Sequence, residues 1–251
     1  MSDGSLVHRP WWAKIAGWSK ARRIGVGSLL GVAALVVGLA ADFQSFIDRF
    51  VTHPLTPELA STLEDTVRQV KRSPRRTDDP ASLESTFEVF AKTHHVSIDD
   101  VRKVGLETSR QMDLAEESLA RGVSMARQHL YEQARREFSS ATENDPGNPA
   151  GWSNLAAANT LLGRYDEARV AYDRALLLTP KDWRIRYNFG LLFARTGDTR
   201  EAMKHLTQVL SFLRSAADKR KQLDEVVAEL ESDPALGGLR HAVGYAALVG
   251  R

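Results

Sequence analysis

The sequence predicts an all-α fold, a right-handed helical solenoid of about three repeats with capping helices, preceded by one transmembrane helix. Two observations support this prediction. Small, aromatic and proline residues recur with a period of 34 between residues 115 and 216, which is the length of two short helices and their turns. Nearer the N-terminus, residues 24–41 form an apolar run without a charged side chain, as is typical of a helix that spans a bilayer.

The composition excludes several classes of protein before any motif is considered. The 251 residues are 43% hydrophobic and 26% charged, as in ordinary folded proteins, so a wholly disordered chain is excluded. The formal net charge of +2 gives no global basic excess of the kind that drives non-specific binding to nucleic acid. Because the chain has no cysteine, thiol catalysis, disulfides and cysteine-ligated metals are excluded as well.

Residues 24–43 are predicted to form the transmembrane helix, which makes the lipid bilayer an expected partner. The apolar run at its centre, at about 1.5 Å per residue, covers roughly 27 Å, close to the hydrocarbon thickness of a bilayer. The preceding segment, 1–23, is basic and rich in tryptophan, whereas the flank after the span has few basic residues. Because basic flanks stay on the side that is not translocated, we expect the N-terminus in the cytoplasm and the solenoid outside it.

Alternatives to this topology stay open at the level of sequence. The apolar run could be a buried core helix, or a signal peptide that is cleaved on export, and the solenoid could lie in the cytoplasm. Within the span, small residues at steps of four and three share one helix face, which would let a second copy or a partner helix approach closely. These residues are Gly27, Gly31, Ala34 and Gly38.

Residues 44–80 are predicted to be a linker that contains a short helix. Thr56 and Pro57 suit the N-cap and the first position of a helix that continues to about residue 70. The basic cluster 71–76 is interpreted as solvated linker, with binding to phosphate or anionic lipid as the alternative.

Residues 81–114 are predicted to form a helical hairpin that packs onto the following helices. Ser97, with Asp100 three residues later, resembles a capping box that starts the second helix. Two helices joined by a tight turn are also typical of DNA-binding motifs, so a membrane-anchored DNA-binding regulator that uses residues 83–110 is the alternative function. Asp99 and Asp100 would approach the phosphates in that arrangement, which makes nucleic acid an unexpected partner.

Internal repetition is the most informative feature of the chain. Ala134, Ala168 and Ala202 lie 34 residues apart, as do Gly163 and Gly197. Each unit has an apolar helix, a turn and a second helix whose alanine suits a close helix crossing. The middle copy carries the fullest pattern, with Trp152, Leu155, Ala156, Asn159, Gly163, Tyr165, Ala168, Tyr172, Ala175 and Pro180. In these residues the chain resembles a tetratricopeptide repeat (TPR) protein.

The resemblance implies repeats that stack into a solenoid with a concave groove. The repeats are expected at 115–148, 149–182 and 183–216, and residues 217–251 are expected to form capping helices. The first copy departs from the pattern, with Ser118 at the place of the middle copy's tryptophan, and the third ends without a proline.

The sequence contains no familiar catalytic motif. It has no G-x-x-x-x-G-K-[ST] phosphate loop, no G-x-S-x-G elbow and no H-E-x-x-H pair. We therefore expect that the protein is not an enzyme and that it uses no cofactor and no metal.

The resemblance also implies a function, because TPR arrays bind peptides or protein segments in the groove lined by the first helix of each repeat. Asparagine at groove positions would pair with peptide amides, and arginine would pair with carboxylates. Leu119 and Val123 stand where the family's carboxylate clamp has lysine and asparagine, so a chain-terminal carboxylate is not the expected ligand. We expect a membrane-tethered scaffold that recruits a partner protein or peptide in envelope assembly or signalling. The groove positions are Arg127, Asn154, Arg184, Tyr187, Asn188 and Arg195.

Overall fold

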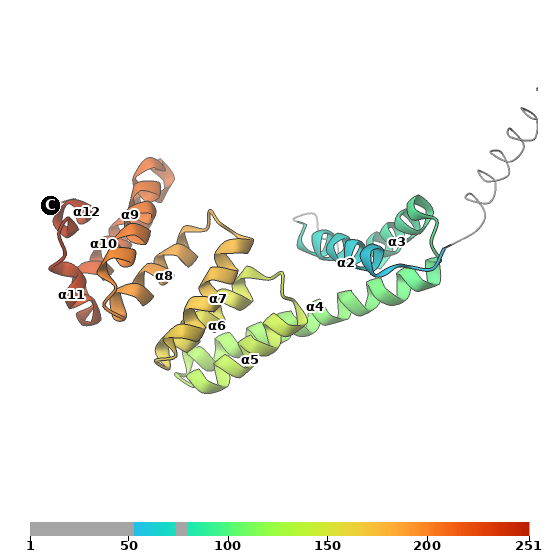
Figure 1. Cartoon of the computed structure of the whole chain (residues 1–251), viewed down its shortest axis with the longest axis horizontal. Coiled ribbons are helices and arrows are strands. Elements are labelled where there is room, and N and C mark those ends of the chain that lie inside the picture. The colour runs from blue at the N-terminus through green and yellow to red at the C-terminus, as the bar shows by residue number, and fades with distance from the viewer. Residues whose placement is uncertain (1–52, 74–79, 251) are drawn as a thin grey trace, which may run out of the picture.

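The computed structural model describes residues 53–73 and 80–250 (Figure 1). Every regular element among them is a helix, so the all-α prediction is confirmed. α2 and α3 lie beside the N-terminal half of α4, and the other helices continue from its C-terminal end (Figure 1). The elements are α2 (Pro57–Arg72), α3 (Pro80–His94), α4 (Ile98–Arg127), α5 (Tyr131–Asn144), α6 (Pro149–Leu161), α7 (Tyr165–Leu178), α8 (Trp183–Arg195), α9 (Thr199–Ser215), η2 (Ala217–Lys219), α10 (Arg220–Ser232), η3 (Pro234–Leu236), α11 (Gly237–Arg240) and α12 (Tyr245–Val249).

The predicted localisation needs correction. No helix within residues 53–73 and 80–250 is both long and apolar enough to cross a membrane, so a single-pass membrane protein with an extracytoplasmic solenoid is not supported. The longest described helix, α4, has 30 residues but carries charged side chains along its whole length. The predicted span 24–43 lies outside the described residues, together with segment 1–23 and the small residues Gly27, Gly31, Ala34 and Gly38.

The helix expected within the linker forms as α2 and is part of the folded array. It begins at the predicted cap, where the Leu59 amide donates to Thr56 Oγ1 at 3.3 Å. Leu63 and Val67 on its inner face are fully buried. They pack in one cluster with apolar side chains of α3, α4 and the turn between them, namely Phe87, Phe90, Ala91, Val96 and Val101.

Two cations at the end of α2 hold it against helices far along the chain. Lys71 pairs with Asp113 on α4. Arg72 Nη2 donates to both carboxylate oxygens of Asp145, at the end of α5, over 2.6 and 2.7 Å. The interpretation of cluster 71–76 as solvated linker is therefore wrong for these two residues, because both make ion pairs within the fold.

α4 joins the predicted hairpin and the first repeat in one continuous helix. The boundary that was predicted between residues 114 and 115 falls inside it. Buried positions at steps of three and four continue across that point, so the same side of α4 packs against α2 and then against α5. With no proline between its ends, nothing in the chain interrupts the helix. The buried positions are Val101, Gly105, Thr108, Met112, Ala115, Ser118 and Gly122.

The second and third repeats each form a helix pair. α6 and α7 lie within 149–182, and α8 and α9 lie within 183–216. Both pairs turn at a glycine with positive φ, 72° at Gly163 and 81° at Gly197, which glycine adopts without the clash of a Cβ atom. His129 occupies the equivalent turn between α4 and α5, with φ of 61°.

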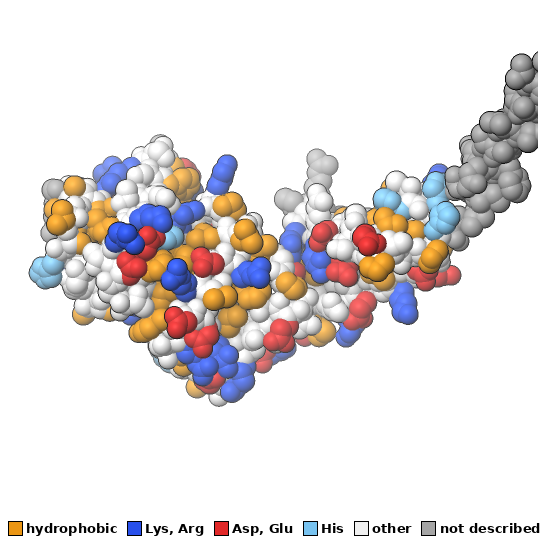
Figure 2. All heavy atoms as spheres, in the orientation of Figure 1, with side chains coloured by type: hydrophobic (Ala, Val, Ile, Leu, Met, Phe, Trp, Pro, Cys, Tyr) orange, Lys and Arg blue, Asp and Glu red, His pale blue; other side chains and the backbone are white. Residues whose placement is uncertain are grey.

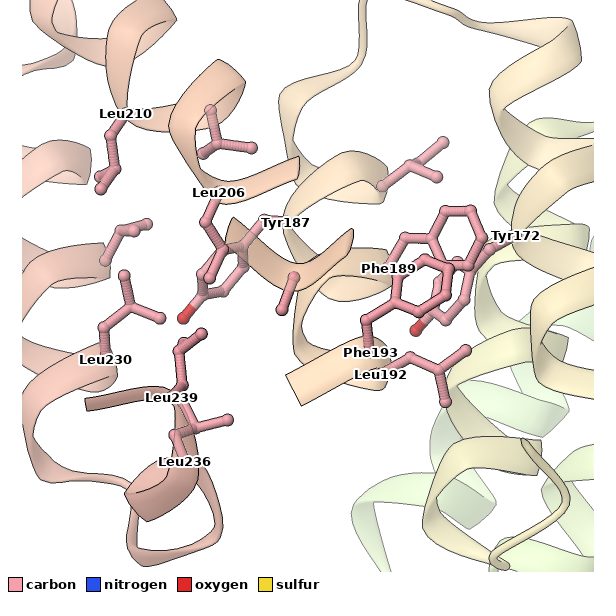
Figure 3. Close-up of a cluster of buried hydrophobic side chains, with 14 of the residues drawn as sticks. Tyr172, Tyr187, Phe189, Leu192, Phe193, Leu206, Leu210, Leu230, Leu236 and Leu239 are labelled. Atoms are coloured by element: carbon pink, nitrogen blue, oxygen red, sulfur yellow. The ribbon is translucent and has the colours of Figure 1, made fainter. Parts of the chain in front are cut away.

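The segment after α9 covers the end of the last repeat. Figure 3 shows Leu230, Leu236 and Leu239 of this segment close to Tyr187 on α8 and Leu206 on α9. All five side chains are buried and belong to one apolar cluster. The segment thus removes the apolar edge of the last repeat from water, as a capping segment of a solenoid does.

His205 on α9 predicts a pH dependence of stability. It is buried, and its ring stacks on Phe193 with 5.5 Å between the ring centroids. Burial and, after it, the charges of Arg186 and Lys204 lower the pKa of His205 below its ordinary value of 6.5. Because the unfolded chain then binds this proton more readily, the stability present above pH 6.5 is lost as the pH falls through that value towards the folded pKa. In urea titrations between pH 7 and pH 5, the free energy of unfolding should fall more steeply for the wild type than for His205→Gln; equal slopes would contradict this.

Candidate functional site

The candidate site lies on the first helices of the repeats. Four predicted groove residues remain accessible there, and the surface they occupy on the end of α4, on α6 and on α8 is named the first-helix face. These residues are Arg127, Asn154, Arg184 and Asn188. The two asparagines are equivalent because they lie 34 residues apart. Arg184 precedes Asn188 by one helical turn, so both side chains lie on the same side of α8.

Helix capping fixes where these side chains stand. The Ala150 amide donates to Asn148 Oδ1 at 3.0 Å and starts α6, and the Arg184 amide donates to Asp182 Oδ1 at 2.8 Å and starts α8. Because the two helices begin at equivalent residues, their asparagines occupy the same position in the second turn. Neighbouring repeats thus present one carboxamide each.

The side chains of the first-helix face are free for a ligand. Among the described residues, no hydrogen bond joins the side-chain carboxamide of Asn154 or Asn188 to another group. Both side chains are half-buried, so each amide can donate and accept at a partly desolvated position. The Arg184 guanidinium lies over the Trp183 ring, 4.9 Å from its centroid, which leaves the edge of the guanidinium available for a carboxylate.

Tyr187 does not lie on an open groove. It is 7% exposed and points towards Leu230 and Leu239 of the capping segment (Figure 3). Burial and the neighbouring Glu229 raise the pKa of the Tyr187 hydroxyl well above its ordinary value of 10. The side chain therefore supports the contact between α8 and the capping segment, a contact that the repeat pattern alone does not reveal.

Arg195 also makes an ion pair within the fold. Its Nη2 atom lies 2.9 Å from Asp233 Oδ2 in the turn after α10. Asp233 in turn accepts from the Ala235 amide at 2.9 Å and starts η3. The ion pair therefore fixes the capping segment to the end of α8. Sequence analysis could not find this partner, because it lies 38 residues away and outside the repeats.

The region of the alternative function, residues 83–110, offers no concentration of positive charge. Arg102 donates through Nε to Glu84 at 2.7 Å, and Asp99 and Asp100 stand in the first turn of α4. On the face shown in Figure 2, Lys and Arg side chains over α2, α3 and the N-terminal half of α4 lie among Asp and Glu side chains. Binding to the phosphates of a nucleic acid is favoured by a surface on which Lys and Arg gather without Asp and Glu between them.

Three cavities in the described residues are lined by none of the four residues that define the first-helix face. One of about 830 Å³ lies between α9, α10 and α12, and one of about 790 Å³ lies between α2 and the α5–α6 loop. A third, of about 420 Å³, lies between α5, α6 and α7 and is lined by Asn159. The repeat pattern includes Asn159 but does not by itself place it at a cavity. The residue 34 positions later is the aromatic Phe193, so the equivalent positions of the two repeats differ in size.

Comparison with known proteins supports the repeats. The tetratricopeptide repeat family matches residues 149–215. Superkiller protein 3 of Schizosaccharomyces pombe is 27% identical over 194 residues, 73% of this chain and 14% of that protein. The peroxisomal targeting signal receptor of Candida glabrata is 36% identical over 74 residues, 30% of this chain and 12% of that protein. Among solved structures, the type III secretion translocator chaperone SycD of Yersinia enterocolitica has a TM-score of 0.43 and 19% identity, over 48% of this chain and 83% of that chain.

The family match coincides with the helix pairs α6–α7 and α8–α9. The pair α4–α5, outside the matched residues, packs in the same way, since Gly122 faces Phe138 as Gly190 faces Leu206. These findings support tetratricopeptide repeats in this chain. The chain spans only 14% and 12% of the lengths of the two curated relatives, so their names describe much larger proteins.

Proposed function

We propose that this chain is a protein–protein interaction scaffold that binds an extended segment of a partner protein on the first-helix face, and that it acts by binding and not by catalysis. The observation that supports this proposal is the repetition of one feature, a half-buried asparagine with an unused amide, at Asn154 and Asn188. A single asparagine of this kind would be ordinary. Two at equivalent positions of stacked repeats give a surface with a regular spacing of donors and acceptors.

An extended peptide matches this surface because each of its peptide units carries one donor and one acceptor. A carboxamide side chain can accept from the N–H and donate to the C=O of a peptide unit. Asn154 and Asn188 would therefore hold the backbone of the segment whatever its side chains are. Selectivity would come from the residues around them.

Arginine supplies that selectivity. Arg184 on α8 and Arg127 at the end of α4 are exposed, and neither makes an ion pair with a described residue. A guanidinium pairs well with a carboxylate through two parallel N–H donors. Leu119 and Val123 add partly buried apolar surface in the first repeat. The preferred segment is thus extended and acidic, with apolar residues where it contacts α4.

The Arg184→Ala, Asn188→Ala double variant is expected to bind such segments about tenfold more weakly than the wild type, a loss of ~1.4 kcal/mol. The loss is modest because Arg184 is exposed and water competes for it. The measurement uses peptides selected on the wild-type chain from a random displayed library, with dissociation constants determined by calorimetry. The selected peptides should be enriched in Asp and Glu.

Arg220→Ala is the matched control, because this arginine lies on α10, outside the first-helix face, with its side chain 82% exposed. It should leave the dissociation constants unchanged. Selected peptides that bind the folded double variant as tightly as the wild type would refute the proposal, and circular dichroism of the double variant establishes that it is folded.

A further inference from the structure

The cavity between α5, α6 and α7 is a gap in an otherwise filled repeat. Its volume is about 420 Å³. α6 contributes Trp152, Leu155 and Asn159 to its lining, α7 contributes Val170 and Ala171, and Arg135 comes from α5. None of the four residues that define the first-helix face lines this cavity, so the site is separate from that face and does not depend on the function proposed for it.

The next repeat shows what normally fills this position. Phe193 lies 34 residues after Asn159, and His205 lies 34 residues after Ala171. The rings of Phe193, on α8, and His205, on α9, are both buried and stack with 5.5 Å between their centroids. In the middle repeat, an asparagine and an alanine stand at these two places, so the aromatic volume is missing.

A cation is already in place for an aromatic ring in the cavity. In the filled repeat, the Arg169 guanidinium lies over the Phe193 ring, 5.7 Å from its centroid. Arg135, which lines the cavity, stands 34 residues before Arg169. Glu132 accepts from Arg135 Nη2 at 3.0 Å, which limits the positions of the guanidinium. The cavity thus has the cation of a cation–π contact, supplied by α5 of the first repeat, without the ring.

Asn159, one of the residues that line the cavity, carries an unused hydrogen-bond acceptor that is buried from solvent. Asn159 is 4% exposed, and its Oδ1 atom has no partner among the described residues. The nearby Trp152 indole N–H cannot serve, because it donates to the Pro146 carbonyl at 2.8 Å. A buried acceptor without a donor is unfavourable, so Asn159 marks a place where a donor is expected to bind.

We propose that this cavity binds a tryptophan side chain presented by a partner protein. The indole N–H donates to Asn159 Oδ1, the ring packs against Val170 and Ala171, and the Arg135 guanidinium covers one face of the ring. Tryptophan meets all three conditions, since it combines a large ring, a strong cation–π surface and a single donor. Val170 is 61% exposed, which leaves apolar surface beside the cavity for the backbone that carries the tryptophan.

N-acetyl-L-tryptophanamide is the probe for this site, with N-acetyl-L-phenylalaninamide as the matched probe that lacks the side-chain donor. The full chain, ¹³C-labelled at alanine and valine methyl groups, is titrated with each probe and followed by NMR. The tryptophan probe should give saturable shifts at the methyl groups of Val170 and Ala171, with affinity about tenfold higher than that of the phenylalanine probe. No saturable shift, as expected of a cavity that merely holds water, would overturn the proposal.

Two substitutions of Asn159 test the hydrogen-bond acceptor and the cavity volume separately. Asn159→Leu keeps a side chain of similar size without the amide, so the preference for the tryptophan probe should disappear. Asn159→Phe fills the cavity as Phe193 fills its own repeat, so binding of both probes should be lost while the melting temperature rises. Ala171→Leu fills the cavity from α7 and should also abolish binding. Shifts that persist in a folded filled variant, or a tryptophan preference retained by Asn159→Leu, would overturn the proposal.

The Arg184→Ala, Asn188→Ala variant distinguishes this site from the first-helix face. It should bind the tryptophan probe as the wild type does. A loss of probe binding in that variant would show that the tryptophan binds on the first-helix face instead of in the cavity, and would contradict the assignment.

Discussion

Gly105→Ala and Gly122→Ala are each expected to lower the free energy of unfolding by about 3 kcal/mol. In an exposed helix the same change is stabilising by ~1 kcal/mol, because alanine is the better helix former. Here the sign reverses. A Cβ atom at Gly105 would lie 2.2 Å from Phe87 Cε1, and one at Gly122 would lie 2.5 Å from Phe138 Cε1. Both rings are buried and have no free space to move into, so α4 would be forced away from its neighbours.

Urea denaturation measures this loss, and two further variants test its cause. Gly238→Ala in α11 is the matched control, since nothing lies within 4 Å of the added Cβ atom, and it should be neutral or slightly stabilising. Gly105→Ala combined with Phe87→Leu should recover part of the loss, because the smaller side chain makes room for the methyl group. A stabilised Gly105→Ala protein would show that α3 and α4 are not in close contact at this point.

The helix pairs of the second and third repeats were predictable because their signals are local and repeated. Gly163 and Gly197 permit the turns by their positive φ, and small residues such as Ala156 and Gly190 permit the close crossings. Each feature acts within one repeat or between neighbours. A period in the sequence therefore translates directly into a period in the structure.

Features outside the period could not be predicted in the same way. The continuity of α4 arises because its buried stripe serves two different partners, α2 and α5, and a repeat boundary at residue 115 has no physical marker. The pairing of Lys71 with α4 and of Arg72 with the end of α5 depends on contacts across 42 and 73 residues. Such pairs are set by the tertiary fold, and the local sequence shows only a basic cluster.

The residues of the candidate site differ in the same way, since some follow from the repeat period and others do not. Asn154 and Asn188 could be assigned to a shared face from their spacing alone, because position in a repeat determines orientation. Tyr187 could not, since it is covered by a capping segment that has no repeat pattern. The role of Asn159 becomes visible only when two repeats are compared. Phe193 has an aromatic ring at the equivalent position one repeat later, and Asn159 has none.

Asp145→Ala is expected to lower the free energy of unfolding by about 3 kcal/mol and to loosen α2. The Asp145 side chain is only 3% exposed. It accepts two hydrogen bonds from Arg72 Nη2, and Arg68 Nε lies 3.9 Å away. Breaking a buried ion pair by removing one partner typically costs 3–5 kcal/mol. Arg72 loses this carboxylate, whereas Arg68 keeps its ion pairs with Glu64 and Asp65. The lower end applies because the Arg72 side chain is 40% exposed and water can reach it.

Asp113→Ala provides the matched comparison, because it also removes an aspartate that pairs with the end of α2. The Asp113 side chain is 54% exposed, and Lys71, although only 10% exposed, keeps its hydrogen bonds to Ser109 O and Oγ, so the loss should be about 1 kcal/mol. Hydrogen exchange of the α2 amides should become much faster in Asp145→Ala and change little in Asp113→Ala. If both variants lose the same small free energy and protect α2 equally, then α2 is held by Leu63 and Val67 alone. The ion pair between Asp145 and Arg72 would then contribute nothing to holding α2 against the repeats.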